Sequence, residues 1–268
     1  MTGRYVGVLP AGGRGTRLAP MHYPKELLPI VYEPTLGTGV RPRAVAEYAL
    51  DAIRAAGADQ VLVVVAPWKL DVLTYLGDGR QFGSDLSYLY QEQAQGLPHA
   101  LDLAYPWVRD DHVVFAMPDT ITAPGDAIAL LRESYVRAGA DLALAVFPTE
   151  RAHQAGPVVM DGQQVLRVYD KPEQPPVFNT WGAAVWGPAF SALLHNELGR
   201  LTDTEVEPAL GDYFDLAVRS GLTVVARYFP HGSYEDAGTH VGILRCVGPD
   251  TDAPAAAMSV PADSGRSA

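Results

Sequence analysis

The hydrophobic pattern of this chain alternates between short apolar runs and amphipathic segments. The apolar runs, which are typical of strands covered on both faces, lie at residues 5–9, 60–66, 86–90, 112–117 and 141–147. The segments between them, which carry apolar residues at helical spacing, lie at residues 44–56, 69–76, 97–104 and 126–138. Strands that alternate with helices predict an α/β fold with a mostly parallel sheet.

The pattern changes beyond residue 150. Asp161-Gly162 between two short apolar runs predicts a β-hairpin. We expect two helices at 188–198 and 208–220, then a strand at 222–229 and a last short helix from about residue 239. The Pro- and Gly-containing segment 33–43 is predicted to be a loop. Residues 249–268 are rich in Ala, Pro, Ser, Asp and Gly, which predicts a disordered tail.

A glycine-rich loop follows the first predicted strand. Gly12, Gly13 and Gly15 allow backbone N–H groups to approach a phosphate chain without interference from side chains. Arg17 and Lys25 bring positive charge to the same place. This combination suits a nucleoside triphosphate. The alternative is a generic strand-to-helix turn with cations placed on a solvated surface by chance.

Two polar residues follow predicted strands, at the edge where open α/β sheets bind their ligands. Gln91 follows the strand near 86–90, and its amide supplies both the donor and the acceptor needed to read a pyrimidine edge. The alternative is that this amide only satisfies loop backbone groups. Asp119 follows the strand at 112–117, and a buried carboxylate needs a cation as partner.

Mg²⁺ is the cation that the sequence favours for Asp119, because one or two carboxylates plus substrate phosphate oxygens are its usual ligands. Asp236, just before the last predicted helix, is the candidate second ligand. The competing interpretation of both aspartates is helix capping. The seven histidines show no zinc-site spacing, and no Ser or Cys lies in a triad-like context.

Composition narrows the functional classes. The 268 residues are 48% hydrophobic, enough for a sizeable core. The net charge of −11 argues against nucleic-acid binding and against an anionic membrane surface. The single cysteine, Cys246, excludes an internal disulfide framework and fits a reducing cytoplasm. We see neither a signal peptide nor a membrane span in the sequence, so we expect a cytoplasmic protein.

Taken together, residues 12–20 and the run Pro24-Lys25-Glu26-Leu27-Leu28-Pro29 resemble the signature of the sugar-1-phosphate nucleotidyltransferases. Residues 76–91 with Gly96-Leu97 are most similar to glucose-1-phosphate thymidylyltransferase, whereas Pro24-Lys25-Glu26 is closer to the UTP-dependent uridylyltransferases. The resemblance covers residues 5 to about 247. It implies one Rossmann-like domain over 1–248, with a nucleotide-binding half (about 1–150) and a smaller acceptor-binding half (about 151–248).

The resemblance also implies roles for individual residues. It assigns the triphosphate to Arg17 and Lys25, and Mg²⁺ to Asp119 and Asp236. The residues that it places around the nucleotide are Leu9, Ala11, Gly12, Gly13, Gln91 and Gly96. Those that it places at the sugar and its phosphate are Gly156, Asp170 and Lys171, with Arg200 as the nearest candidate for the arginine that binds the acceptor phosphate.

The activity implied is transfer of a nucleotidyl group from dTTP or UTP to a sugar 1-phosphate, glucose 1-phosphate first, with release of pyrophosphate. Because residues 35–43 and 179–183 depart from the family pattern, the sequence does not determine which acceptor is used. Cyclitol phosphates, phosphonates and other phosphomonoesters with another NTP are therefore alternatives. A non-catalytic nucleotide-binding paralogue is a third reading. The oligomeric state stays open, with a homo-oligomer among the alternatives.

Overall fold

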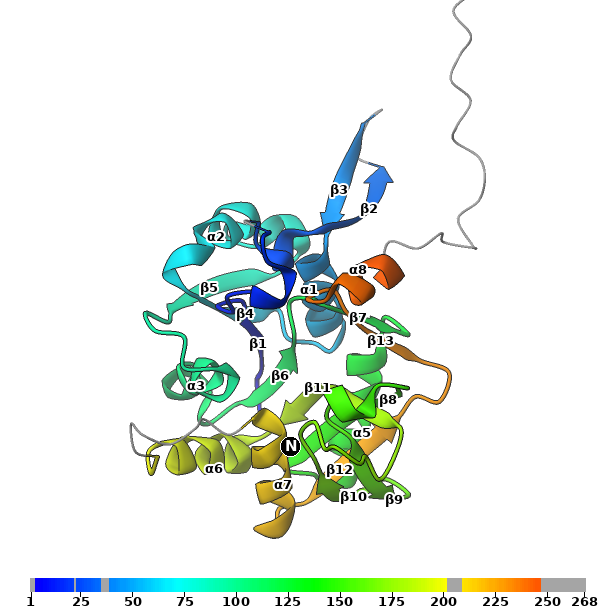
Figure 1. Ribbon diagram of the computed structural model, residues 1–268. Helices are drawn as coiled ribbons and strands as arrows, with labels where there is room; N and C mark the ends of the chain where they lie inside the picture. Colours follow the sequence, from blue (N-terminus) through cyan, green and yellow to red (C-terminus); the bar gives the residue numbers. More distant parts are fainter. Residues whose placement is uncertain (1–2, 22, 35–38, 202–208, 247–268) are drawn as a thin grey trace, which may run out of the picture.

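The computed structural model describes residues 3–21, 23–34, 39–201 and 209–246, and its centre is one nine-stranded sheet (Figure 1). The strands, in spatial order, are β5 (Asp85–Tyr90), β4 (Gln60–Val65), β1 (Tyr5–Pro10), β6 (His112–Ala116), β11 (Asn179–Trp186), β8 (Leu142–Pro148), β12 (Val224–Tyr228), β10 (Gln164–Val168) and β9 (Val158–Asp161). The pairings make β11 and β10 antiparallel to the other strands. The predicted mostly parallel α/β sheet is therefore confirmed.

Helices cover both faces of this sheet. The first face packs against α1 (Val45–Ala55), α2 (Leu70–Leu76) and α5 (Ala127–Ala138). The second packs against α3 (Leu97–Asp102), α4 (Tyr105–Val108), α6 (Pro188–Leu198) and α7 (Leu210–Arg219). Burial of the strands on two sides explains why runs such as residues 61–65 are uniformly apolar. None of the described helices is long and apolar enough to cross a membrane.

The order of the strands creates a topological switch point. From β1 the chain builds outward through β4 to β5, and then returns to place β6 on the other side of β1. The loops that leave the carboxyl ends of β1 and β6 therefore diverge and leave a crevice between them. These two loops contain the glycine-rich segment and Asp119.

Two small sheets flank this crevice. In the first, β7 (Thr120–Ala123) pairs antiparallel with β13 (Ser233–Asp236), and α8 (His240–Cys246) follows. In the second, β2 (Pro29–Pro34) pairs antiparallel with β3 (Val40–Ala44), and this pair projects from the body of the molecule (Figure 1). Short 3₁₀ turns occupy η1 (Thr16–Leu18), η2 (Lys25–Leu27), η3 (Pro67–Lys69), η4 (Arg80–Phe82) and η5 (Ala152–Gln154).

Two sequence-based expectations about elements were wrong or incomplete. The predicted loop 33–43 contains β3, whose Arg41 pairs with Glu33 across the β2–β3 pair and with Glu47 of α1. The central strand β11 was not predicted, because the segment 179–183 was considered only as a substrate motif. The predicted hairpin at Asp161-Gly162 is confirmed as β9–β10. The predicted tail, 249–268, lies outside the described residues.

Candidate functional site

The glycine-rich loop lies at the switch point, directly after β1. The Ala11 N–H donates to the carbonyl of Val64 on β4, which holds the start of the loop against the sheet. A Cβ at Gly12 would lie 3.1 Å from the Oε1 atom of Gln91, so a side chain here would press on that amide. Gly15 has φ +67°, a left-handed conformation that favours glycine. The loop therefore needs glycine at position 12 for its close approach to Gln91, and at position 15 for its left-handed turn.

Gln91 reaches the same crevice from β5. Its N–H donates to the carbonyl of Val65, and its side chain is buried beside Gly12. Among the described residues, nothing accepts a hydrogen bond from its Nε2. A buried amide donor without a partner is costly in an isolated protein and is satisfied when a ligand supplies an acceptor. Gly96, at φ +96°, lies beyond this position and is the N-cap of α3.

Leu9 and Ala11 also belong to this region, but both side chains are fully buried in the core beneath the loop. Neither residue exposes any surface in this structure, so both support the loop from beneath. Gly13 lies next to Lys25, because a Cβ added at Gly13 would be 3.9 Å from the Lys25 Nζ. The predicted phosphate-loop residues are thus adjacent in space as well as in sequence.

Lys25 lies under the glycine loop, on η2, and its ammonium forms an ion pair with Asp119. The lysine side chain is 11% exposed and that of Asp119 is 2% exposed. Burial lowers the pKa of Lys25, but the Asp119 carboxylate more than offsets this effect, so the pKa lies above its usual value. Lys25 is therefore a fixed positive charge at neutral pH.

The two predicted metal ligands come together through the pairing of β7 with β13. The register places Asp236 opposite Thr120, the residue after Asp119, and the Ala237 N–H donates to the Asp119 carbonyl. Between the carboxylates lies Gly238, where a Cβ would be 2.7 Å from an oxygen of each. The Arg17 guanidinium forms an ion pair with Asp236 at 3.0 Å.

This pair of carboxylates fits a magnesium ion. The Oδ1 of Asp119 is buried and has no hydrogen-bond partner among the described residues, which leaves a free acidic oxygen beside Asp236. In the described part of the chain no group of three or more Asp, Glu, His or Cys gathers into a metal site. A magnesium ion here would therefore take two protein carboxylates, with phosphate oxygens and water completing its shell.

A second buried ion pair lies beside the first and was not predicted. Lys69, on η3, pairs with Glu26 at 2.6 Å, and the two side chains are 4% and 1% exposed. Burial raises the pKa of Glu26 despite the attraction of Lys69. Glu26 and Lys25 are neighbours on η2 that hold different partners, so this pair fixes the turn that presents Lys25. The sequence signal that could have drawn attention to this pair is the scarcity of lysine. The chain has three lysines, and Lys69 is the one that lies outside a recognisable motif.

The acceptor-side residues lie across the crevice, near β11. The Gly156 N–H donates to the Thr180 hydroxyl, and a Cβ at Gly156 would overlap the Trp181 indole. Asp170 follows β10, and burial raises the pKa of its carboxyl. Lys171 has φ +42°, an uncommon conformation for a residue with a side chain, and its N–H donates to the Ala155 carbonyl.

Arg200 is not brought to this group. It lies just beyond α6, where its exposed guanidinium pairs with Glu197 on the last turn of that helix. It is also absent from the residues that line the large cavity described next.

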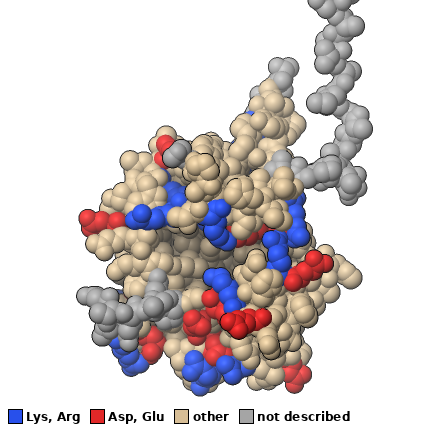
Figure 2. Space-filling view, viewed as in Figure 1, with Lys and Arg blue, Asp and Glu red and all other residues tan. Residues whose placement is uncertain are grey.

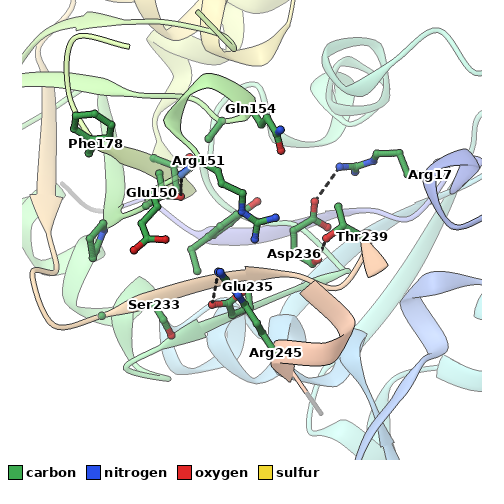
Figure 3. A pocket seen from close by; sticks show the side chains of 16 residues that line it. Arg17, Glu150, Arg151, Gln154, Phe178, Ser233, Glu235, Asp236, Thr239 and Arg245 are labelled. Atoms are coloured by element: carbon green, nitrogen blue, oxygen red, sulfur yellow. Dashed lines mark hydrogen bonds and ion pairs between the residues drawn. The ribbon is translucent and has the colours of Figure 1, made fainter. Parts of the chain in front are cut away.

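A cavity of about 650 Å³ opens from the Arg17–Asp236 pair toward the acceptor side (Figure 3). Figure 2 shows basic side chains around the hollow that crosses the middle of this face. The residues that line the cavity are Arg17, Pro148, Thr149, Glu150, Arg151, Gln154, Ala155, Phe178, Thr180, Gly232, Ser233, Tyr234, Glu235, Asp236, Thr239 and Arg245. Hydroxyl and amide groups with an exposed aromatic ring are groups that recognise sugars. Of these residues, Arg17 and Asp236 were predicted from the sequence as site residues. The others come from β8, η5, β11, β13, α8 and the loops between elements, which no local sequence pattern brings together.

The sheet order and the helix layers define an α/β protein with the nucleotide-diphospho-sugar transferase fold, as two solved structures show. A Bacillus anthracis protein described as a glucose-1-phosphate thymidylyltransferase and crystallised with sucrose superposes with a TM-score of 0.79. It is 21% identical, and the match covers 93% of this chain and 96% of that one. A UDP-glucose pyrophosphorylase complexed with UDP-glucose superposes with a TM-score of 0.75. It is 19% identical, and the match covers 91% of this chain and 97% of that one.

A sequence profile of the nucleotidyl transferase family matches residues 6–249, and the chain belongs to this family. The nucleotidyltransferase Agl11 of low-salt glycan biosynthesis in Haloferax volcanii is 30% identical over 210 residues, which are 76% of this chain and 56% of Agl11. A Streptomyces griseus glucose-1-phosphate thymidylyltransferase is 28% identical over 228 residues, 82% of this chain and 60% of that enzyme. This chain thus spans less than two thirds of either relative.

Proposed function

We propose that this chain transfers a nucleotidyl group from dTTP or UTP to a sugar 1-phosphate, glucose 1-phosphate first, and releases pyrophosphate. The observation that carries the proposal is the meeting of Lys25, Asp119 and Asp236 beside the glycine loop at the switch point. Residues far apart in sequence supply cations, carboxylates and open backbone at one place. This combination suits a triphosphate and a metal ion, and family membership supports it.

In the proposed reaction an oxygen of the acceptor phosphate attacks the α-phosphorus. A new P–O bond forms, the bond from the α-phosphorus to the bridging oxygen breaks, and pyrophosphate leaves with that bond's electrons. A phosphomonoester already carries about −1.5 to −2 charges at pH 7, so no general base is needed. The ion pair with Asp119 that keeps Lys25 positively charged agrees with a reaction driven by charge stabilisation.

The obstacle is repulsion between two polyanions. Two unit charges about 4 Å apart repel by about 4 kcal/mol at an effective dielectric of about 20, and several such pairs act together. Magnesium bound by Asp119 and Asp236 would supply positive charge at the phosphates. Lys25 and Arg17 would hold the triphosphate in line, and Lys171 would act on the acceptor side. Gln91 would hydrogen-bond the base through its unpartnered amide.

The acceptor and the base need a direct test. The experiment is a matrix of dTTP, UTP, ATP, GTP and CTP against glucose 1-phosphate, other sugar 1-phosphates, a cyclitol phosphate and a phosphonate, with released pyrophosphate as the readout. We expect turnover with dTTP or UTP and glucose 1-phosphate, abolished by EDTA. If turnover occurs only with another acceptor, the proposed reaction type stands and the proposed acceptor is wrong. The similarity to a nucleotidyltransferase of glycan biosynthesis makes this outcome worth testing. No pyrophosphate from any pair would leave the non-catalytic alternative.

The proposal places the reaction in the cytoplasm, which agrees with a single cysteine among 268 residues.

A further inference from the structure

Three guanidinium groups from separate parts of the chain line the cavity. Arg17 belongs to η1 in the nucleotide-binding half, Arg151 follows β8, and Arg245 belongs to α8. Figure 3 shows Arg151 reaching into the cavity between Gln154 and Asp236. Three carboxylates, those of Glu150, Glu235 and Asp236, line the same cavity, so which of the three arginines is free to bind an anion depends on their ion pairs.

The three arginines differ in their partners. Arg17 forms its ion pair with Asp236 at 3.0 Å, and Arg245 lies 3.7 Å from Glu235. In the described part of the chain no carboxylate lies within ion-pair distance of the Arg151 guanidinium. A guanidinium presents a planar fork of donors that matches a phosphate. Arg151 is thus the arginine of this cavity whose charge is left for a ligand.

The backbone of Arg151 is held in place although its side chain is unpaired. Its N–H donates to the Thr149 hydroxyl at 3.2 Å, and its carbonyl accepts from the Gln154 N–H at 2.9 Å. The next residue, Ala152, is fully buried and anchors the turn η5. The charge is therefore presented from a fixed turn, which lowers the entropic cost of using it.

We propose that Arg151 binds the phosphate of the acceptor. This inference rests on the proposed function, because it assigns a binding residue to the second substrate of that reaction. The attacking phosphate must reach the nucleotide beside Asp119 and Asp236, and Asp236 lines the same cavity as Arg151. The sugar then extends outward toward Phe178, which lines the cavity and is 68% exposed.

This assignment differs from the one that resemblance implies. Arg200 already pairs with Glu197 and does not line the cavity, whereas Arg151 does and has no such partner. Lys171 lies outside the lining as well. Among the described arginines that line the cavity, Arg151 is therefore the one whose positive charge has no carboxylate partner.

The test compares Arg151→Gln and Arg151→Lys with Arg137→Gln, a matched control that removes an exposed arginine of α5. We expect Arg151→Gln to raise the KM for the sugar 1-phosphate about 10–100-fold, the effect of losing one charged hydrogen-bonding partner. The KM for the nucleotide stays within about twofold, Arg151→Lys recovers part of the loss, and the control is unchanged. Circular dichroism verifies that each variant is folded.

A binding measurement makes the test independent of turnover. Glucose 1-phosphate, and inorganic phosphate as the minimal probe, are titrated calorimetrically into the full chain. Binding that Arg151→Gln abolishes supports the inference, even if no nucleotide pair gives turnover and the proposed function fails. The inference is overturned if neither probe binds the unsubstituted protein, if Arg151→Gln binds and turns over normally, or if Arg200→Gln alone produces the loss.

Discussion

The Lys25 ammonium lies against the Asp119 carboxylate, although 94 positions separate the two residues in the chain. A second pair, Arg17 with Asp236, spans 219 positions and closes the same site. Each cation that we assign to the triphosphate is thus held by a carboxylate that we assign to the metal. The positive groups are therefore oriented before substrates arrive, which is the condition for electrostatic stabilisation of a transition state.

Removal of Lys25 tests this arrangement most directly. We expect Lys25→Ala to lower turnover by about 10²–10³-fold, the scale of losing one preorganised electrostatic contact. The measurement is kcat for pyrophosphate release at saturating substrates, with the thermal midpoint recorded to exclude unfolding. Turnover within about threefold of the unsubstituted protein would remove Lys25 from the mechanism.

Asp119→Asn tests the metal assignment. The substitution keeps the shape of the side chain but removes the acidic oxygen that has no partner, so we expect magnesium-dependent turnover to fall by at least about 10²-fold. A magnesium titration should also show a higher requirement in Asp236→Asn. Asp110→Asn, at an exposed site, is the control. Normal turnover of Asp119→Asn at ordinary magnesium concentrations would show that Asp119 is not the metal ligand.

Gln91→Ala tests recognition of the base. Loss of one hydrogen-bonding group predicts a drop of about 3–10-fold in kcat/KM for the preferred nucleotide. The drop should be smaller for poorly used nucleotides, because the amide contributes less to them. Gln164→Ala, an exposed position on β10, should leave both values unchanged. An equal loss for every nucleotide would indicate that Gln91 supports the loop rather than the base.

Gly156→Ala tests the packing on the acceptor side. An added methyl group would overlap the partly buried Trp181 indole, so we expect a loss of about 1–3 kcal/mol in the free energy of unfolding. The matched control is Gly125→Ala, where no atom lies within 4 Å of the new methyl group. Denaturant titration of both variants measures the difference, and equal stability of the two would contradict the packing described here.

Glu47 provides a prediction about pH. Burial alone would raise the pKa of this carboxyl, but hydrogen bonds from Arg41, Tyr75 and the Ala44 N–H outweigh it, so the pKa lies below its usual value. A depressed acidic pKa contributes stability above the unfolded-state value of about 4.3, and this contribution is lost as the pH falls through the folded-state value.

We therefore expect Glu47→Gln to lower the free energy of unfolding by about 1–3 kcal/mol near pH 7. The gap between variant and unsubstituted protein should narrow below about pH 4, where the carboxylate becomes protonated. Glu133→Gln, at an exposed position of α5, serves as the control in the same denaturation series. A gap that stays constant across this range would show that the charge of Glu47 is not responsible.

Local physical chemistry made much of this protein predictable from its sequence. Uniformly apolar runs become strands covered on both faces, and the helix 188–198 was predicted to the residue because Pro188 begins it and Gly199 follows its end. The nucleotide-side residues were predictable for a similar reason. They lie in one short segment, or at the ends of parallel strands that must share one edge of the sheet.

Only the tertiary structure decided which distant residues meet. The insertion of β11 between β6 and β8 depends on long-range pairing, which no local pattern encodes. The ion pairs of Lys25 with Asp119 and of Lys69 with Glu26, and the unpaired charge of Arg151, likewise depend on where separate loops come to lie. Side-chain partners are set by packing across the whole chain, whereas helices and strands are set largely by neighbours in sequence.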